Sequence, residues 1–213
     1  MEAPRPHDAE PDRPPRVRTR PETPCGPEKG ALRPDAGYEL WFQDETEPTL
    51  LPYLVGCWGP RGEQTLVPTP GKNAKRAVFG ALQYGAGRFL GLTCPRKNSG
   101  AFCELLLRMA QRARRTGRKI LMVADNARFH TTKKATALAE ELRSWVRIVW
   151  LPKYASNLNE IEPFWKHVKS ESFGNRLYRS REEFEGHVEE VVAALNRKST
   201  ALDAWRARRR AVA

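Results

Sequence analysis

The chain has 213 residues and a formal net charge of +12, which is enough length for one domain with a substantial core and enough charge to point to a polyanionic partner, most simply nucleic acid. Its four cysteines lie far apart, without a Cys-x-x-Cys pair or clustered histidines, which argues against a structural zinc site and does not suggest a disulfide framework. No apolar run approaches the ~18–20 residues of a membrane span and the N-terminus lacks the apolar core of a signal peptide, so we expect a soluble protein of a reducing compartment.

Residues 1–37 form a Pro/Arg-rich segment that we predict to be disordered. They hold nine of the seventeen prolines and no aromatic residue, and their seven basic and seven acidic residues cancel. Such a segment buries too little apolar surface to offset the entropy of ordering it. The whole net charge therefore belongs to the rest of the chain, which we divide into a folded domain over 38–198 and a basic tail over 199–213.

The first ordered elements are predicted as strands. The stretch YELWFQDE begins at Tyr38, alternates like a strand and ends in acids. Residues 54–68 (LVGCWGPRGEQTLVP) and 76–92 (RAVFGALQYGAGRFLGL) are predicted as strands broken by Gly-Pro-Arg-Gly and Gly-Ala-Gly turns. We expect an antiparallel meander.

Helices and strands alternate in the second half. Residues 100–117 have apolar side chains at helical spacing, with Gly117 as the C-terminal cap. The remaining predicted elements are a strand over 119–125, a helix starting at Thr131 or Thr132, a strand over 147–152, and helices around 161–170 and 181–196. Strands that alternate with helices run parallel with right-handed crossovers, so we predict an α/β fold with a mixed sheet flanked by helices, in the order of an RNase H-like fold.

Acidic residues stand where two of these strands end. Active sites gather at the carboxyl ends of parallel strands, and Asp125 lies at such an end. A central first strand would bring Asp44 beside it. Taken alone, Asp125 is more typical of a residue that ends a strand and begins a turn than of a catalytic residue.

A third carboxylate is expected from the helix that begins near residue 161. Apolar residues recur on one face of this helix, while Glu162, Lys166 and Lys169 share another. Three converging carboxylates repel one another unless a cation sits between them, and oxygen ligands suit Mg²⁺ or Mn²⁺. Two such ions ~3.5–4 Å apart would clamp the attacking and leaving oxygens of a phosphoryl displacement.

The blocks FQDE, VADNARFH and LPKYASNLNEIEPFWKHVK resemble the three catalytic blocks of DDE transposases, closest to the insertion sequence 630 family of the mariner-like superfamily. Asp44, Asp125 and Glu162 match the three acids of that motif, and residues 58–62 resemble the second strand of the family.

The resemblance implies an RNase H-like domain that cleaves double-stranded DNA at transposon ends and joins the freed 3′-hydroxyls to target DNA, at a TA dinucleotide as in relatives. It implies two Mg²⁺ or Mn²⁺ ions held by the three acids, a homodimer, and a place in the bacterial cytoplasm with the nucleoid. A helix-turn-helix region, which relatives use to read inverted repeats, is expected as a separately encoded portion. In the third block Lys153, Ala155, Ser156 and Glu160 replace Pro, Ser, Pro and Pro of the usual pattern, which loosens the loop before Glu162.

Several side chains near the acids have two interpretations. Asn126 is expected to fix the turn after Asp125, whereas His130 could orient a carboxylate, contact DNA or be purely structural. Arg128 is either a phosphate contact or a solvated surface residue. Lys166 and Lys169 either contact phosphates or pair with Glu162 along the helix.

Two alternatives concern the acids themselves. Asn159 and Glu162 have the spacing of a capping box, which does not exclude metal binding. Glu45, Glu47 and Glu160 are expected to point away from Asp44 and Glu162. At the level of function, the rival hypotheses are an RNase H-like nuclease of another pathway and an inactive, transposase-derived DNA-binding remnant.

Overall fold

The computed structural model describes residues 37–152 and 158–197, so the predicted N-terminal segment, the basic tail, and Lys153, Ala155 and Ser156 lie outside the described residues. The elements follow the predicted order of strands and helices. They are β1 (Tyr38–Thr46), β2 (Ala77–Gln83), β3 (Phe89–Cys94), α1 (Ser99–Thr116), β4 (Lys119–Ala124), α2 (Lys133–Glu141), β5 (Val146–Trp150), α3 (Ile161–Phe173) and α4 (Arg181–Arg197). Within the described ranges, no helix combines the length and apolar character needed to cross a bilayer.

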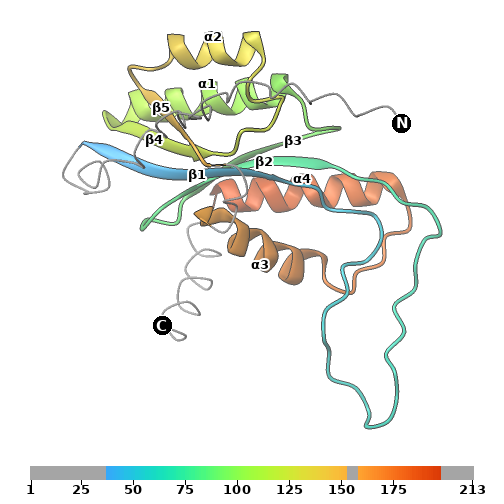
Figure 1. The fold of residues 1–213 in the computed structure, drawn as a ribbon. Coiled ribbons are helices and arrows are strands. Elements are labelled where there is room, and N and C mark those ends of the chain that lie inside the picture. The colour runs from blue at the N-terminus through green and yellow to red at the C-terminus, as the bar shows by residue number, and fades with distance from the viewer. Residues whose placement is uncertain (1–36, 153–157, 198–213) are drawn as a thin grey trace, which may run out of the picture.

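The five strands form one mixed sheet in the order β3-β2-β1-β4-β5 (Figure 1). The pairs β1–β2 and β2–β3 are antiparallel, whereas β1–β4 and β4–β5 are parallel. The central strand is therefore β1, as predicted. Its parallel register with β4 pairs Phe42 with Val123. Asp44 and Asp125 each follow two residues later, so the two acids lie at the same level on neighbouring strands.

Helices cover both faces of the sheet, with α1 and α2 on one side and α3 and α4 on the other (Figure 1). Each side has its own apolar core: Trp41 belongs to the core under α1 and α2, and Phe42 packs against the core under α3 and α4. Successive strand residues point to opposite faces. Gln43 and Glu45 therefore point with Trp41, while Asp44 points with Phe42 towards α3.

A glycine on β2 brings α3 close to the first acid. Gly80 pairs with Asp44, and a Cβ atom at Gly80 would lie 2.6 Å from ring atoms of both Phe89 and Trp165. Any larger residue would push the Trp165 ring, and with it α3, away from the sheet. The missing side chain lets α3 settle beside the strand that carries Asp44.

The predicted helix boundaries are confirmed at two capping residues. Thr132 begins α2, with its hydroxyl oxygen accepting from the Ala135 amide at 3.3 Å. Gly117 follows α1 with φ of 66°, the left-handed conformation in which glycine ends helices.

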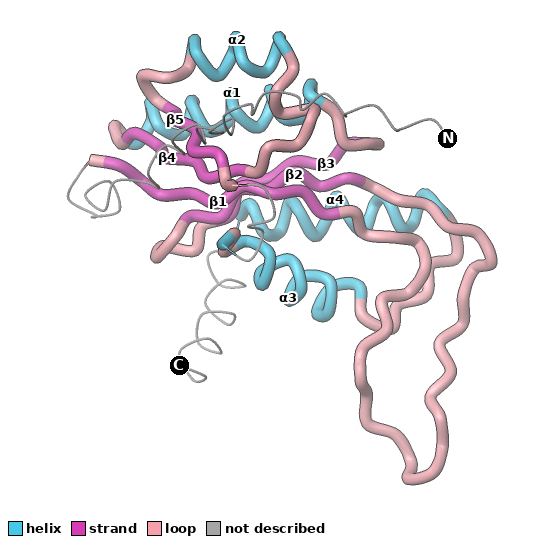
Figure 2. Tube along the Cα trace, viewed as in Figure 1, coloured by secondary structure: helices cyan, strands magenta, loops and turns pink. Residues whose placement is uncertain are grey.

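The predicted strand content of residues 54–68 is wrong. This stretch belongs to a long loop between β1 and β2 that extends away from the sheet (Figure 2). None of the strands that the structure describes pairs with it, and its largest apolar side chains lie in solvent: Trp58 is fully exposed and Leu66 is 82% exposed. The other two strands of the antiparallel part of the sheet, β2 and β3, come instead from residues 76–94. The chain reverses direction between them at Gly85 and Gly87.

Candidate active site

Asp44 is a half-buried residue of β1, two residues before the strand ends at Thr46. Burial, together with the nearby negative charges of Glu45 and Asp125, raises its pKa to about 7. Both effects act against the ionised form. Near neutral pH, this carboxyl therefore carries an unfavourable charge that a bound cation would relieve.

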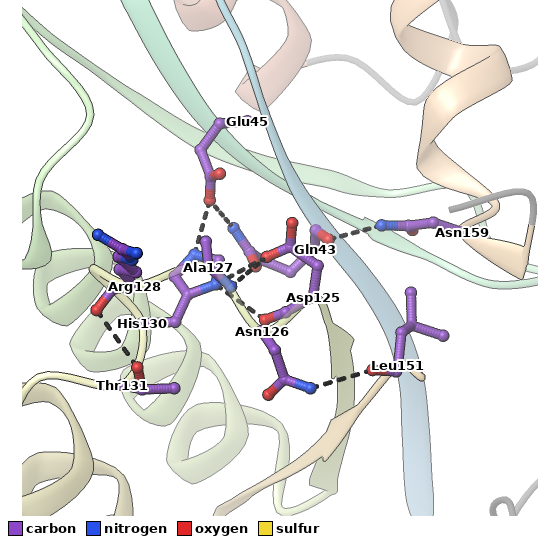
Figure 3. A network of polar contacts seen from close by, with 10 residues as sticks. All are labelled: Gln43, Glu45, Asp125, Asn126, Ala127, Arg128, His130, Thr131, Leu151 and Asn159. Atoms are coloured by element: carbon purple, nitrogen blue, oxygen red, sulfur yellow. Dashed lines mark hydrogen bonds and ion pairs between the residues drawn. The ribbon is translucent and has the colours of Figure 1, made fainter. Parts of the chain in front are cut away.

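Asp125 is the first residue after β4, and its side chain is 54% exposed. Its Oδ1 atom accepts from the Nδ1 of His130 at 3.0 Å and from the Ala127 amide at 3.1 Å (Figure 3). The hydrogen bond from His130 is the main reason why the pKa of Asp125 is lowered, against a smaller opposing effect of burial. Asn126 donates to the Leu151 carbonyl oxygen at 3.1 Å, which fastens the turn after Asp125 to the chain that leaves β5.

His130 is buried, with 1% of its surface exposed, so among its three interpretations the structure favours the orientation of a carboxylate. Its ring lies among Phe102, Phe129 and Trp150 on the α1 side of the sheet. Both nitrogens face acceptors: Nδ1 faces Asp125, and Nε2 lies 2.9 Å from the Glu45 Oε1 atom. Burial disfavours the charged ring, but hydrogen bonds to the two carboxylates outweigh it and raise the pKa of His130 to about 9.

The helix that carries Glu162 is tied to β1. Asn159 is buried, and its Nδ2 donates to the Gln43 carbonyl oxygen at 2.9 Å, on the peptide that leads into Asp44. The N-cap position of α3 is Glu160, which makes no side-chain cap, so the capping box of Asn159 and Glu162 does not form. Instead, the Glu162 amide donates to the Asn159 carbonyl oxygen at 3.1 Å.

The structure brings two of the three predicted acids together. The charge of Asp125 is felt at Asp44, whereas Glu162 lies half-buried in the first turn of α3. In the described part of the chain, no three His, Cys, Asp or Glu side chains lie close enough to hold one metal ion. The predicted convergence of all three acids on one metal ion is therefore not seen among the described residues.

Four positively charged side chains could face a phosphate. Arg128 and Lys166 are exposed and Lys169 is half-buried, all three as the sequence allowed. Sequence reasoning missed Lys97, whose charge acts on both Asp44 and Asp125 and whose Nζ lies 4.0 Å from Glu47 Oε2. The sequence pattern could have indicated Lys97. In the predicted antiparallel meander the third strand runs in the same direction as β1, and Lys97 follows the carboxyl end of this strand, β3.

A comparison of sequences assigns the chain to a family. Residues 39–185, well over half of the chain, match the family model described as DDE superfamily endonuclease. The chain belongs to this endonuclease family. Over 131 residues it is 30% identical to a Shigella sonnei protein, "Insertion element IS630 uncharacterized 39 kDa protein", in an alignment that covers 62% of this chain and 38% of that protein. The chain therefore spans well under half the length of this relative.

Solved structures show the same fold. The Mos1 transposase paired-end complex with the left transposon end has a TM-score of 0.54 and 14% identity, over 77% of this chain and 51% of that one. The Mos1 mariner paired-end complex with Mn has a TM-score of 0.55 and 13% identity, over 76% of this chain and 50% of that one. The RNase H-like fold predicted for this DDE endonuclease is confirmed.

Membership of the DDE family implies dependence on a divalent metal, and the residues on the sheet fit one. Asp44 and Asp125 offer only oxygen donors, which suit a hard cation. Within the described part of the chain, the Oδ2 atom of Asp125 makes no hydrogen bond, because both of its contacts use Oδ1. A cation beside Asp44 would also favour the ionised carboxyl, which burial and the charges of Glu45 and Asp125 disfavour.

Proposed function

We propose that this DDE endonuclease is the catalytic part of a transposase of the insertion sequence 630 type. It would cleave DNA phosphodiester bonds at transposon ends and join the freed 3′-hydroxyls to target DNA at TA. The observation that carries the proposal is the pair of carboxylates, Asp44 and Asp125, at one level on neighbouring parallel strands of an RNase H-like sheet. Relatives that are transposase and insertion-element proteins support this function over a nuclease of another pathway.

The metal ligands in this proposal are Asp44, Asp125 and Glu162, holding two Mg²⁺ or Mn²⁺ ions. When bound, such ions polarise the scissile phosphate and activate the attacking oxygen. Asp44 must lose its proton to become a ligand, whereas Asp125 is kept ionised by its hydrogen bond from His130. Glu162 would complete the ligand set from the start of α3.

The chemistry consists of two in-line displacements at phosphorus. In cleavage, a water oxygen bonds to phosphorus, the bond from phosphorus to the 3′-oxygen breaks, and the leaving oxygen takes up a proton. In joining, the freed 3′-hydroxyl loses its proton and its oxygen bonds to the phosphorus of a target phosphodiester, while the bond from that phosphorus to the target 3′-oxygen breaks and the leaving oxygen takes up a proton. Lys97 and Arg128 lie near the strand-end acids, and Lys166 and Lys169 lie on α3, where they would contact the phosphate backbone of duplex DNA.

Two partners belong to the same proposal. We expect the active form to be a homodimer, since each transposon has two ends to be cut and joined. A separately encoded helix-turn-helix portion would supply recognition of the inverted repeats.

The test is nicking of a supercoiled plasmid by the full chain in Mg²⁺ and in Mn²⁺, beside Asp125→Asn and Glu162→Gln. We expect metal-dependent nicking that both substitutions abolish, and that Glu140→Gln, a change of an exposed acid on α2, leaves unchanged. Nicking that survives both substitutions would place the chemistry elsewhere. A duplex that carries transposon ends then separates strand transfer from simple hydrolysis.

A further inference from the structure

We infer that a buried chain of polar side chains positions the catalytic acids relative to one another. Its members are Gln43, Glu45, His130 and Asn159 (Figure 3). They connect the segments that carry Asp44, Asp125 and Glu162, and the inference rests on the proposed function only in taking these acids as metal ligands. Glu45 is its central residue, although by strand alternation this carboxylate points away from Asp44.

Three of the links meet at Glu45 and His130. The Glu45 Oε1 atom accepts from the Gln43 Nε2 at 2.6 Å and lies 2.9 Å from the His130 Nε2. The other ring nitrogen, Nδ1, lies 3.0 Å from Asp125 Oδ1 and 3.0 Å from the Asp125 carbonyl oxygen. Both nitrogens of one ring therefore bridge β1 to the residue that ends β4.

The fourth link reaches α3. The backbone carbonyl of Gln43 accepts from the Asn159 amide at 2.9 Å, so the residue whose side chain holds Glu45 also holds the start of the helix that carries Glu162. The chain of contacts thus passes from α3, through β1, to the turn after β4. Each of the three acid-bearing segments contributes at least one atom to it.

These connected polar side chains are buried at positions where apolar side chains would be usual. Gln43 is 0% exposed and Glu45 is 8% exposed, on the same face of β1 as the core residue Trp41. Burying ionic groups costs desolvation, and well-packed apolar residues of similar volume often give equal or greater stability. Polar side chains at these positions therefore point to a task other than stability.

That task is orientation of Asp125. His130 and the Ala127 amide both bind Oδ1, and the ring is in turn held by Glu45 and by its aromatic neighbours. A carboxylate with one oxygen fixed in this way presents the other, Oδ2, in one direction on the exposed side. A metal ligand oriented through a second residue typically loses affinity when that outer partner is removed.

The experiment measures Mn²⁺ binding and plasmid nicking for the full chain as wild type, Glu45→Leu, Glu45→Gln and Glu140→Gln. Mn²⁺ affinity is followed by the electron paramagnetic resonance of free Mn²⁺, and folding by thermal unfolding without metal. Glu45→Leu is expected to weaken Mn²⁺ binding by ~10–100-fold and to lower the unfolding temperature, because the buried His130 ring and the Gln43 amide lose their partner. Glu45→Gln, which keeps an oxygen acceptor, restores part of the affinity, and Glu140→Gln matches the wild type.

Unchanged Mn²⁺ affinity in a folded Glu45→Leu protein would overturn the inference. If Glu45→Leu does not fold, Gln43→Met is measured in its place with the same expected direction and the same refuting result. Wild-type protein that binds Mn²⁺ but nicks nothing contradicts the proposed function alone. Wild-type protein that nicks, with every Glu45 variant equal to it, contradicts the inference alone.

Discussion

Replacing Asp44 by Asn should make the metal-free protein more stable at pH 8 and leave it little changed at pH 4. The folded pKa of Asp44 is about 7, raised from 3.8 by burial and by the charges of Glu45 and Asp125. A carboxyl with a raised folded pKa gives its full stabilising contribution below pH 3.8, and this contribution is lost as pH rises through about 7. The neutral amide carries no such penalty at any pH.

The magnitude follows from the shift. Each pKa unit corresponds to about 1.4 kcal/mol, so a shift of roughly 3 units has a ceiling of ~4 kcal/mol at pH 8. Asp44 keeps some contact with solvent, which screens the charge, so we expect ~1–2 kcal/mol. For a domain of this size that is an increase of ~2–8 °C in unfolding temperature.

The assay is thermal unfolding of wild type, Asp44→Asn and Glu140→Gln in EDTA at several pH values from 4 to 8. The difference between Asp44→Asn and wild type should grow with pH, and Mg²⁺ or Mn²⁺ should stabilise the wild type while leaving Asp44→Asn unchanged. A difference that does not depend on pH, or a wild type that is the more stable protein at pH 8, would refute the reasoning.

Gly80→Ala should lower the free energy of unfolding by ~1–3 kcal/mol, because its Cβ atom would lie 2.6 Å from the Trp165 ring. The matched control is Gly186→Ala in α4, where nothing lies within 4 Å of the added Cβ atom. Chemical denaturation should show that this control leaves the free energy of unfolding unchanged or slightly raised. Equal losses of stability at both sites would contradict the close packing at Gly80. Lys97→Gln should weaken DNA binding and reduce its salt slope by ~1 if this side chain contacts a phosphate, measured by fluorescence anisotropy over a salt series. Lys72→Gln in the long loop is its charge-matched control, and identical slopes for wild type and both variants would exclude the contact by Lys97.

The order of the elements could be predicted because periodicity is a local property. The alternation around Asp44, the helical spacing before Gly117 and the strand that ends at Asp125 each identify their own element. Residues 54–68 failed because a strand needs a partner, and partners are set by the whole sheet. Gly and Pro in this stretch marked turns, but the sequence did not say that the chain between them leaves the sheet.

The candidate site was predictable to the same degree. Strand ends placed Asp44 and Asp125 together, and alternation showed that Glu45 faces the other side. The same alternation hid the role of Glu45, since a residue that points away from the acids still reaches one of them through His130. Contacts through an intermediate residue depend on side-chain geometry across elements distant in sequence, which no local pattern contains.

Asparagine amides hold the α3 layer to the rest of the molecule at both ends of that helix. At its start, Asn159 donates to the Gln43 carbonyl oxygen, and just after its end Asn175 donates to the Val55 carbonyl oxygen at 2.8 Å while accepting from the Val55 amide at 3.0 Å. A side-chain amide that pairs with a peptide group satisfies a backbone donor or acceptor that has no partner in the sheet. The first anchor lies on β1 and the second on the loop that follows it, so the strand that carries Asp44 holds the start of α3 and the loop holds the segment just after its end. The position of Glu162 is therefore coupled to that of Asp44 through hydrogen bonds as well as packing, and a change in either anchor should move the third acid without altering the pair on the sheet.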